Sequence, residues 1–335
     1  MATRSIMVDV MGADTSPGAI VAGARRAAEE LGLDVTIVGD PAVIGDTGGL
    51  PVLAATEVVG MDEDPAQAVR RKKDASVVRA AEAVRAGDAG AMVSAGNTGA
   101  AMASALLRMG RISGVQRPAI ATPLPVPGAS PTLLLDCGAN SECTAAWLAQ
   151  FAQMGAVFAA ERFSIAEPRV ALLSIGEEPT KGNALVKEAH ALLSDPACLA
   201  AAGHDGSSAR FIGNVEGHDI LTDGLDVVVT DGFTGNVALK TLEGSVRFLV
   251  EKFFAAMTSS PEAAASLPAL LPALAPLREQ LDPESYGGAM LLGVDGVCII
   301  SHGSSSTKAI FNAVRVAGEM VEADLVGRIA NAIRS

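Results

Sequence analysis

The sequence is poor in aromatic residues and in positive charge. Aromatic side chains make up 3% of its 335 residues, so the 49% hydrophobic fraction consists mainly of Ala, Val, Leu and Ile. A core of this kind suits parallel strands that are covered by helices. The formal net charge of -13 argues against a general nucleic-acid binder, because neutralising phosphates requires clustered Lys and Arg.

Several familiar site motifs are also missing. The four cysteines (Cys137, Cys143, Cys198 and Cys298) show neither CxxC nor zinc-ligand spacing, which fits a reducing compartment and predicts no metal site. No secretory h-region is visible at the start, so we expect a cytoplasmic protein. There is no GxxxxGK[ST] loop, GxGxxG fingerprint, GxSxG elbow or HExxH motif, and any function must rest on other residues.

A recurring pattern joins an apolar run to a glycine-rich polar loop and then to a helical pattern. The clearest copy is DVVVTDGFTGNVALKTLEG at 226–244, and others lie at 6–12, 91–100, 132–141, 170–183 and 297–305. Strands that alternate with helices predict a parallel α/β sheet with right-handed crossovers. We therefore expect all these loops to lie at one carboxyl edge of the sheet and to share one cleft.

The expected cleft is rich in amide and hydroxyl side chains and contains one lysine. Its members are Ser94, Asn97, Thr98, Asn140, Lys181, Asn183, Asp231, Thr234, Asn236, His302 and Ser304. Glycine loops at helix N-termini present unpaired N–H groups, so this cleft would hold an oxyanion. Nothing in it resembles an activated nucleophile, and any chemistry would join two bound substrates directly. Each loop alone is also consistent with ordinary turn chemistry.

Two segments depart from the pattern. The basic cluster, Arg70, Arg71, Lys72 and Lys73, could dock an acidic partner or could be the solvated end of a helix. Residues 263–277 carry no charge and place leucines at helical spacing, with a proline at every fourth position from 268 to 276. We expect a projecting apolar segment at 255–283, within a single domain that spans 1–335.

This apolar segment is too short to span a bilayer. Through Leu270, Leu271 and Leu274 it could contact a membrane surface or a second subunit, although a buried hairpin also fits its composition. Two further stretches have no clear regular structure. Residues 122–131 contain four prolines and suggest an irregular connection rather than a central strand, and 203–213 has the composition of a flexible segment.

Taken in order, the motifs of this chain resemble those of the bacterial acyl-ACP:phosphate acyltransferases of phospholipid synthesis, where ACP is acyl carrier protein. They are RRKKDAS, SAGNTGA, LLLDCGANSE, SIGEEPTKGN, GNVEGHDIL, VVVTDGFTGNVALKTLEG, YGGAMLLGV and SHGSSSTKAI. The resemblance implies a Rossmann-like, mostly parallel sheet with helices on both faces, related to isocitrate and isopropylmalate dehydrogenases. It also implies a homodimer that converts acyl-ACP and inorganic phosphate to acyl-phosphate and free ACP, without a metal or organic cofactor.

Carried over by position, the resemblance implies that Lys181 and Asn236 are the catalytic residues. Lys181 would hold the phosphate, and Asn236 would stabilise the oxyanion that forms when phosphate attacks the thioester. The basic cluster would dock the acidic ACP. The chain departs from the family at Cys137 and Met290, and only Arg278 follows the leucines, which implies weaker membrane attachment than in relatives.

Two other functions fit the same residues. One is an NAD(P)-dependent oxidoreductase of the isopropylmalate dehydrogenase-like fold, and the other is a noncatalytic anion-binding module. Release of ACP thiol that depends on phosphate would separate the acyltransferase from both.

Overall fold

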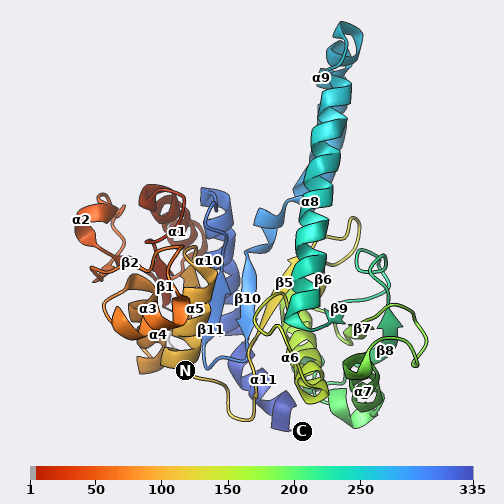
Figure 1. Ribbon diagram of the computed structural model, residues 1–335. Helices are drawn as coiled ribbons and strands as arrows, with labels where there is room; N and C mark the ends of the chain where they lie inside the picture. Colours follow the sequence, from red (N-terminus) through yellow and green to blue (C-terminus); the bar gives the residue numbers. More distant parts are fainter. Residues whose placement is uncertain (1–4, 335) are drawn as a thin grey trace.

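The computed structural model describes residues 5–334, and their strands form one sheet in the order β3-β2-β1-β4-β11-β10-β5-β6-β9-β7-β8 (Figure 1). The strands are β1 (Ile6–Asp9), β2 (Val35–Gly39), β3 (Val52–Ala54), β4 (Ala91–Ser94), β5 (Ala119–Leu124), β6 (Thr132–Leu135), β7 (Arg169–Leu173), β8 (Arg210–Val215), β9 (Val227–Val229), β10 (Ala289–Leu292) and β11 (Val297–Ile300). Most neighbouring strands are parallel, as the alternation of strand and helix patterns predicts.

Eight of the α-helices, α2, α3 and α5–α10, begin after an Asp, Asn, Ser or Thr whose side chain accepts a hydrogen bond from a backbone N–H of the first turn. The α-helices are α1 (Pro17–Leu31), α2 (Pro41–Ile44), α3 (Pro65–Arg71), α4 (Ser76–Ala86), α5 (Thr98–Ser104), α6 (Ala145–Phe163), α7 (Ala184–Leu193), α8 (Gly232–Met257), α9 (Pro261–Leu281), α10 (Thr307–Glu322) and α11 (Leu325–Arg334). A π-helical turn, η1 (Ala105–Met109), continues α5, and short 3₁₀ turns are η2 (Pro196–Leu199), η3 (His204–Gly206) and η4 (Pro283–Tyr286).

Helices cover both faces of the sheet, and the alternation of side chains along each strand divides the core in two. Ile6 and Val8 of β1 pack in one apolar cluster with residues of α1, α6, α10 and α11, whereas Met7 packs in a second cluster with residues of α3, α4 and α5. Leu134 of β6 lies in this second cluster together with Leu239 of α8. Both faces of the strands are therefore buried, as expected for a mostly parallel sheet.

The strand directions correct the prediction that all the glycine loops share one edge. β10 is antiparallel to both β11 and β5, and β5 is antiparallel to β6. β1, β4 and β11 therefore run opposite to β6, β9 and β7. Their loops lie on opposite edges of the sheet, which we call the β4 rim (loops after β1, β4 and β11) and the β9 rim (loops after β6, β9 and β7).

Two strands lie where the composition indicated irregular chain. β5 includes Pro123 and occupies a central position, but β10 pairs only with 119–121, so the strand edge beside Pro123 is free of that neighbour. A residue without an N–H is tolerated at such a position. β8 spans 210–215 and so begins inside the segment 203–213 that is expected to be flexible, and it forms the edge of the sheet beside β7.

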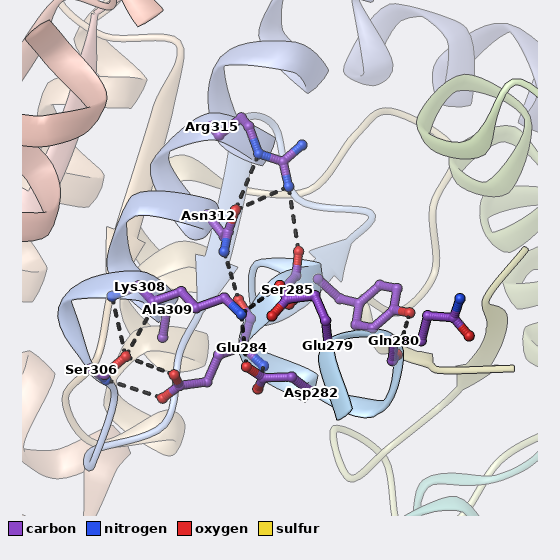
Figure 2. Close-up of polar contacts among 11 residues, drawn as sticks. Glu279, Gln280, Asp282, Glu284, Ser285, Ser306, Lys308, Ala309, Asn312 and Arg315 are labelled. Atoms are coloured by element: carbon purple, nitrogen blue, oxygen red, sulfur yellow. Dashed lines mark hydrogen bonds and ion pairs between the residues drawn. The ribbon is translucent and has the colours of Figure 1, made fainter. Parts of the chain in front are cut away.

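Helices α8 and α9 form a long hairpin that extends well beyond the sheet (Figure 1). None of the α9 residues is buried, and Leu270, Leu271 and Leu277 each expose more than 40% of their surface. At the base of the hairpin, Lys308 Nζ of α10 lies 2.7 Å from Glu279 Oε1 and 2.8 Å from Asp282 Oδ2 (Figure 2). No helix within residues 5–334 has the length and hydropathy needed to cross a bilayer.

Candidate active site

Three adjacent parallel strands bring the loops of the β9 rim together. β6 pairs with β9, and β9 pairs with β7, with Leu135 and Leu172 both level with Val229. The loops that carry Asn140, Asn236 and Lys181 therefore leave the sheet side by side. Of the residues predicted from the sequence, this rim contains Asn140, Lys181, Asn183, Asp231, Thr234 and Asn236.

A buried carboxylate organises the loop after β6. Asp136 is fully buried, and its Oδ1 accepts hydrogen bonds from the backbone N–H groups of Ile120 (3.0 Å), Gly138 (3.2 Å) and Ala139 (3.0 Å). Its Oδ2 accepts from Asn140 N at 2.7 Å and from Asn140 Nδ2 at 2.9 Å. Burial raises the pKa of Asp136 above its ordinary value, and these hydrogen bonds oppose that rise. The loop amides are thus occupied by the protein itself and are not free for an oxyanion.

The same loop packs closely on the first turn of α8. Gly232 N donates to Asn140 O at 2.8 Å, and a Cβ on Gly235 would lie only 2.0 Å from Asp136 O, so a side chain cannot fit there. A Cβ on Gly138 would lie 3.7 Å from Asn236 Cγ. The Asn236 side chain is exposed, lies against Gly138, and has no hydrogen bond or ion pair within residues 5–334.

Lys181 lies in the exposed loop between β7 and α7. Its N–H closes a turn by donating to Glu178 O at 2.9 Å, and the Lys181 side chain is exposed, with no ion-pair partner in the described chain. At the end of β7 the Ser174 hydroxyl is buried without a hydrogen-bond partner in that same range, next to Gly182. Cations and unpaired hydroxyls at a strand end are groups that an oxyanion can engage.

The other predicted residues of the β9 rim serve the fold. Asn183 caps α7 by accepting from Val186 N at 2.9 Å, and Asp231 caps α8 by accepting from Thr234 N at 2.8 Å and from Thr234 Oγ1 at 2.8 Å. Asn140 uses its amide group on Asp136 and on a backbone carbonyl. Two buried residues beside these loops are not among those predicted, although they stand in the motifs LLLDCGANSE and GNVEGHDIL: Asp136, and Asn214 of β8, whose Nδ2 donates to Glu178 O at 3.0 Å.

The predicted residues of the β4 rim lie at the other edge. Ser94 Oγ donates to Asp9 Oδ2 at 2.7 Å, and Asp9 is only 2% exposed, so that burial raises its pKa. Asn97 caps α5, and its Nδ2 donates to Gly60 O at 3.1 Å. His302 and Ser304 are bonded to each other, with 2.7 Å between His302 Nδ1 and Ser304 Oγ. Thr98 is exposed.

The structure divides the basic cluster. Arg70, Arg71 and Lys73 are exposed at the end of α3, whereas Lys72 is half-buried and its Nζ donates to Glu63 Oε1 and to Val58 O. The hydrogen bond from Lys72 lowers the pKa of Glu63. Three of the four residues are therefore available to a partner.

The β9 rim contains two thiols, Cys137 and Cys143, both in the loop after β6. Burial raises the pKa of Cys137 to about 12 and that of Cys143 to about 11, so neither is an activated nucleophile. Within residues 5–334, one group could hold a metal ion: Glu161, His204 and Asp205, on α6 and η3. Arg328 already pairs with Glu161 Oε1 at 3.1 Å and with Asp205 Oδ1 at 3.0 Å.

The fold is that of phosphotransacylases. The structure is similar to a phosphotransacetylase from Streptococcus pyogenes, with a TM-score of 0.62, 17% identity and coverage of 95% of this chain and 94% of that one. The EutD phosphotransacetylase from Staphylococcus aureus gives a TM-score of 0.60 at 16% identity, with 96% of each chain covered. A putative 4-hydroxythreonine-4-phosphate dehydrogenase from Salmonella typhimurium gives a TM-score of 0.51 at 12% identity, over 95% of this chain and 99% of the other.

The sequence comparisons define the family. Residues 4–328 match the family model described as fatty acid synthesis protein. The phosphate acyltransferase of Heliobacterium modesticaldum is 49% identical over 97% of this chain and 96% of its own length, and that of Elusimicrobium minutum is 47% identical over 97% and 94%. The chain belongs to the phosphate acyltransferase family.

Proposed function

We propose that this enzyme transfers the acyl group of acyl-ACP to inorganic phosphate at the β9 rim, for phospholipid synthesis, with Lys181 and Asn236 as catalytic residues. The observation that supports these roles is that both side chains are exposed at the ends of adjacent parallel strands, and the described chain uses neither in a hydrogen bond or ion pair. Most of the other predicted polar residues are already bonded within the fold. Polar groups that the fold leaves free are available to a substrate.

In the proposed reaction the ammonium group of Lys181 holds the phosphate and offsets part of its charge. A phosphate oxygen attacks the thioester carbonyl carbon, and the Asn236 amide donates to the oxyanion that forms. The C–S bond then breaks, the products are acyl-phosphate and the ACP thiolate, and the thiolate takes up a proton from solvent. A thiol with an ordinary pKa near 8.5 leaves without a strong acid.

Apolar side chains beside these residues suit an acyl group. Ile175, which precedes the Lys181 turn, is 80% exposed, and Phe233 and Val237 on the first turns of α8 are 66% and 51% exposed. Phe233, Asn236 and Val237 share one face of the helix, because residues three and four apart are neighbours. An acyl chain that lies along them places its carbonyl carbon near Asn236.

We also infer the partners and the assembly from the family resemblance. Arg70, Arg71 and Lys73 dock the acidic ACP through complementary charge. The single domain over 1–335 forms a cytoplasmic homodimer with an isopropylmalate dehydrogenase-like fold and needs no cofactor. The segment 255–283 contacts the inner face of the membrane transiently, since its exposed leucines lack neighbouring lysines. Liposome flotation that is unchanged when Leu270, Leu271 and Leu274 become Ser would contradict this contact.

Turnover of acyl-ACP with and without phosphate tests the proposed reaction. We expect free ACP thiol to appear in proportion to acyl-phosphate, and only when phosphate is present. Thiol release that is independent of phosphate would argue against the reaction. Reduction of NAD or NADP by a 2-hydroxy acid, with no thiol release, would instead favour an oxidoreductase.

A further inference from the structure

One buried amide connects the edge strand β8 to the loop that carries Lys181. Asn214 is 4% exposed, and its Nδ2 donates to Glu178 O at 3.0 Å. The Lys181 N–H donates to the same carbonyl oxygen at 2.9 Å. Asn214 therefore holds the turn whose last residue is Lys181.

The other end of the Asn214 amide is also fixed. His190 Nδ1 of α7 lies 3.1 Å from Asn214 Oδ1, and the His190 ring packs edge-on against Phe211, with 5.1 Å between ring centroids. Since the Asn214 Nδ2 group donates to Glu178 O, its Oδ1 atom accepts a hydrogen bond from the N–H group of His190 Nδ1. The Asn214 amide is thus fixed by its position on β8 and by its hydrogen bond to α7.

Few other contacts hold this loop. Among residues 5–334, the Asn214 bond is the one hydrogen bond that the rest of the protein makes to residues 175–181. Side chains 177–181 are all exposed. Without this bond, the turn would be free to move relative to the sheet, and the Lys181 side chain would lose its fixed place on the β9 rim.

We propose that Asn214 is a positioning residue, which fixes the Lys181 turn at the distance from Asn236 that phosphate binding requires. This inference rests on the proposed function for the role of Lys181. The hydrogen bonds themselves predict that loss of Asn214 loosens residues 175–181. A catalytic group must be held by its supporting contacts to within a fraction of an ångström.

A matched amide elsewhere in the chain provides the control. Asn312 of α10 is 8% exposed, its Nδ2 donates to Glu284 O at 3.0 Å, and its Oδ1 accepts from Arg315 Nε at 3.3 Å (Figure 2). It lies at the base of the α8–α9 hairpin, and its side-chain hydrogen bonds involve neither Lys181 nor Asn236. Asn312→Asp and Asn214→Asp both lose the bond to a backbone carbonyl and keep the acceptor oxygen.

The experiment compares these two variants by acyl transfer and by hydrogen–deuterium exchange. In Asn214→Asp we expect KM for phosphate to rise about 10-fold, the factor that one hydrogen bond of ordinary strength provides. We expect exchange of the peptide 175–183 to accelerate by about the same factor. In Asn312→Asp neither should change. In a Lys181→Ala background, Asn214→Asp should cause no further loss in kcat/KM for phosphate.

Equal effects of the two variants on KM, or unchanged exchange of 175–183 in Asn214→Asp, would overturn the proposal. Asn214→Ser, which removes both bonds without adding charge, repeats the test if the Asp variant does not fold. A wild-type protein that fails to release thiol with phosphate would refute the proposed function. In that case, the exchange measurement still decides whether Asn214 holds the turn.

Discussion

The two rims of the sheet contain similar residues and use them differently. Each has a buried aspartate at a strand end, Asp9 on the β4 rim and Asp136 on the β9 rim, and each has glycine-rich loops. On the β4 rim the predicted polar side chains, apart from Thr98, bond to other side chains or to backbone. On the β9 rim the side chains of Lys181 and Asn236 make no hydrogen bond or ion pair to any residue in 5–334. A polar composition thus does not by itself define a binding site.

The largest difference between the rims is expected in turnover. Lys181→Ala or Asn236→Ala should lower kcat by about 100-fold to 1,000-fold, as loss of an oxyanion donor does in other enzymes. Thr98→Ala, which removes an exposed hydroxyl from the β4 rim, should leave kcat nearly unchanged. Steady-state rates of thiol release measure all three. If Thr98→Ala is as damaging as Asn236→Ala, the two rims act together, which would require residues from two subunits.

The second largest difference is expected between the two buried aspartates. Substitution of either should reduce stability, but only substitution of Asp136 should also reduce activity. Asp136→Ala leaves the N–H groups of Ile120, Ala139 and Asn140 without their acceptor, and unfolding free energy should fall by about 3 kcal/mol. Asp9→Ala should cost about 2 kcal/mol, since fewer bonds are lost.

Denaturant unfolding measures both stability changes, and kcat is compared under conditions in which each variant is folded. Only Asp136→Ala should then lower kcat, because its loop packs on Asn236. Equal loss of kcat in both variants would argue against the β9 rim as the site of catalysis.

An effect of about 10-fold is expected from Phe233, for long acyl chains only. Phe233→Ser removes apolar surface beside Asn236, and 1.4 kcal/mol of lost burial corresponds to a factor of ten. The measurement is kcat/KM for acyl-ACP substrates of short and long chain. Chromatography with light scattering serves as control, because equal losses for all chains together with a smaller assembly would assign Phe233 to a subunit interface.

The smallest effect, a few-fold change in affinity, is expected from the basic cluster on α3. Arg70, Arg71 and Lys73 are exposed, and their replacement by Glu should weaken ACP binding and flatten its salt dependence. Lys72→Ala should instead reduce stability, because Lys72 is bonded to Glu63. Calorimetric titration with ACP at two salt concentrations gives the affinity for ACP and its salt dependence. Unchanged salt dependence in the Glu variant would exclude this cluster as the docking surface.

Local patterns predicted the alternation of strands and helices, but they could not predict the direction of each strand. The buried run at 227–229 and the Asp231 cap are local features, and both are present in the structure. The reversal between the two rims depends on the antiparallel pairing of β10 with β11 and β5, which joins segments far apart in the sequence. β5 was missed because Pro123 argued against a central strand, and β8 because glycine and serine dominate the residues around it.

The choice of Lys181 and Asn236 came from the family resemblance and stays a prediction, and the structure adds that no other residue in 5–334 bonds to either side chain. The sequence indicated the types of residue in each loop, but not which of their side chains are hydrogen-bonded within the fold. Asn183 and Asp231 are helix caps, and Asn140 is bonded to Asp136. Such assignments depend on three-dimensional neighbours such as Ile120, which is 16 positions from Asp136 along the chain.

Helix α8 runs without interruption from the turn that carries Asn236 to the far end of the hairpin. At 1.5 Å per residue, its 26 residues form a rod of about 39 Å. Only Gly232, Gly235 and Leu239 of this helix are buried, and all three lie in its first turns, so these turns attach it to the rest of the protein. Because α8 is one continuous helix, a tilt of its distal end relative to the sheet would also move Asn236.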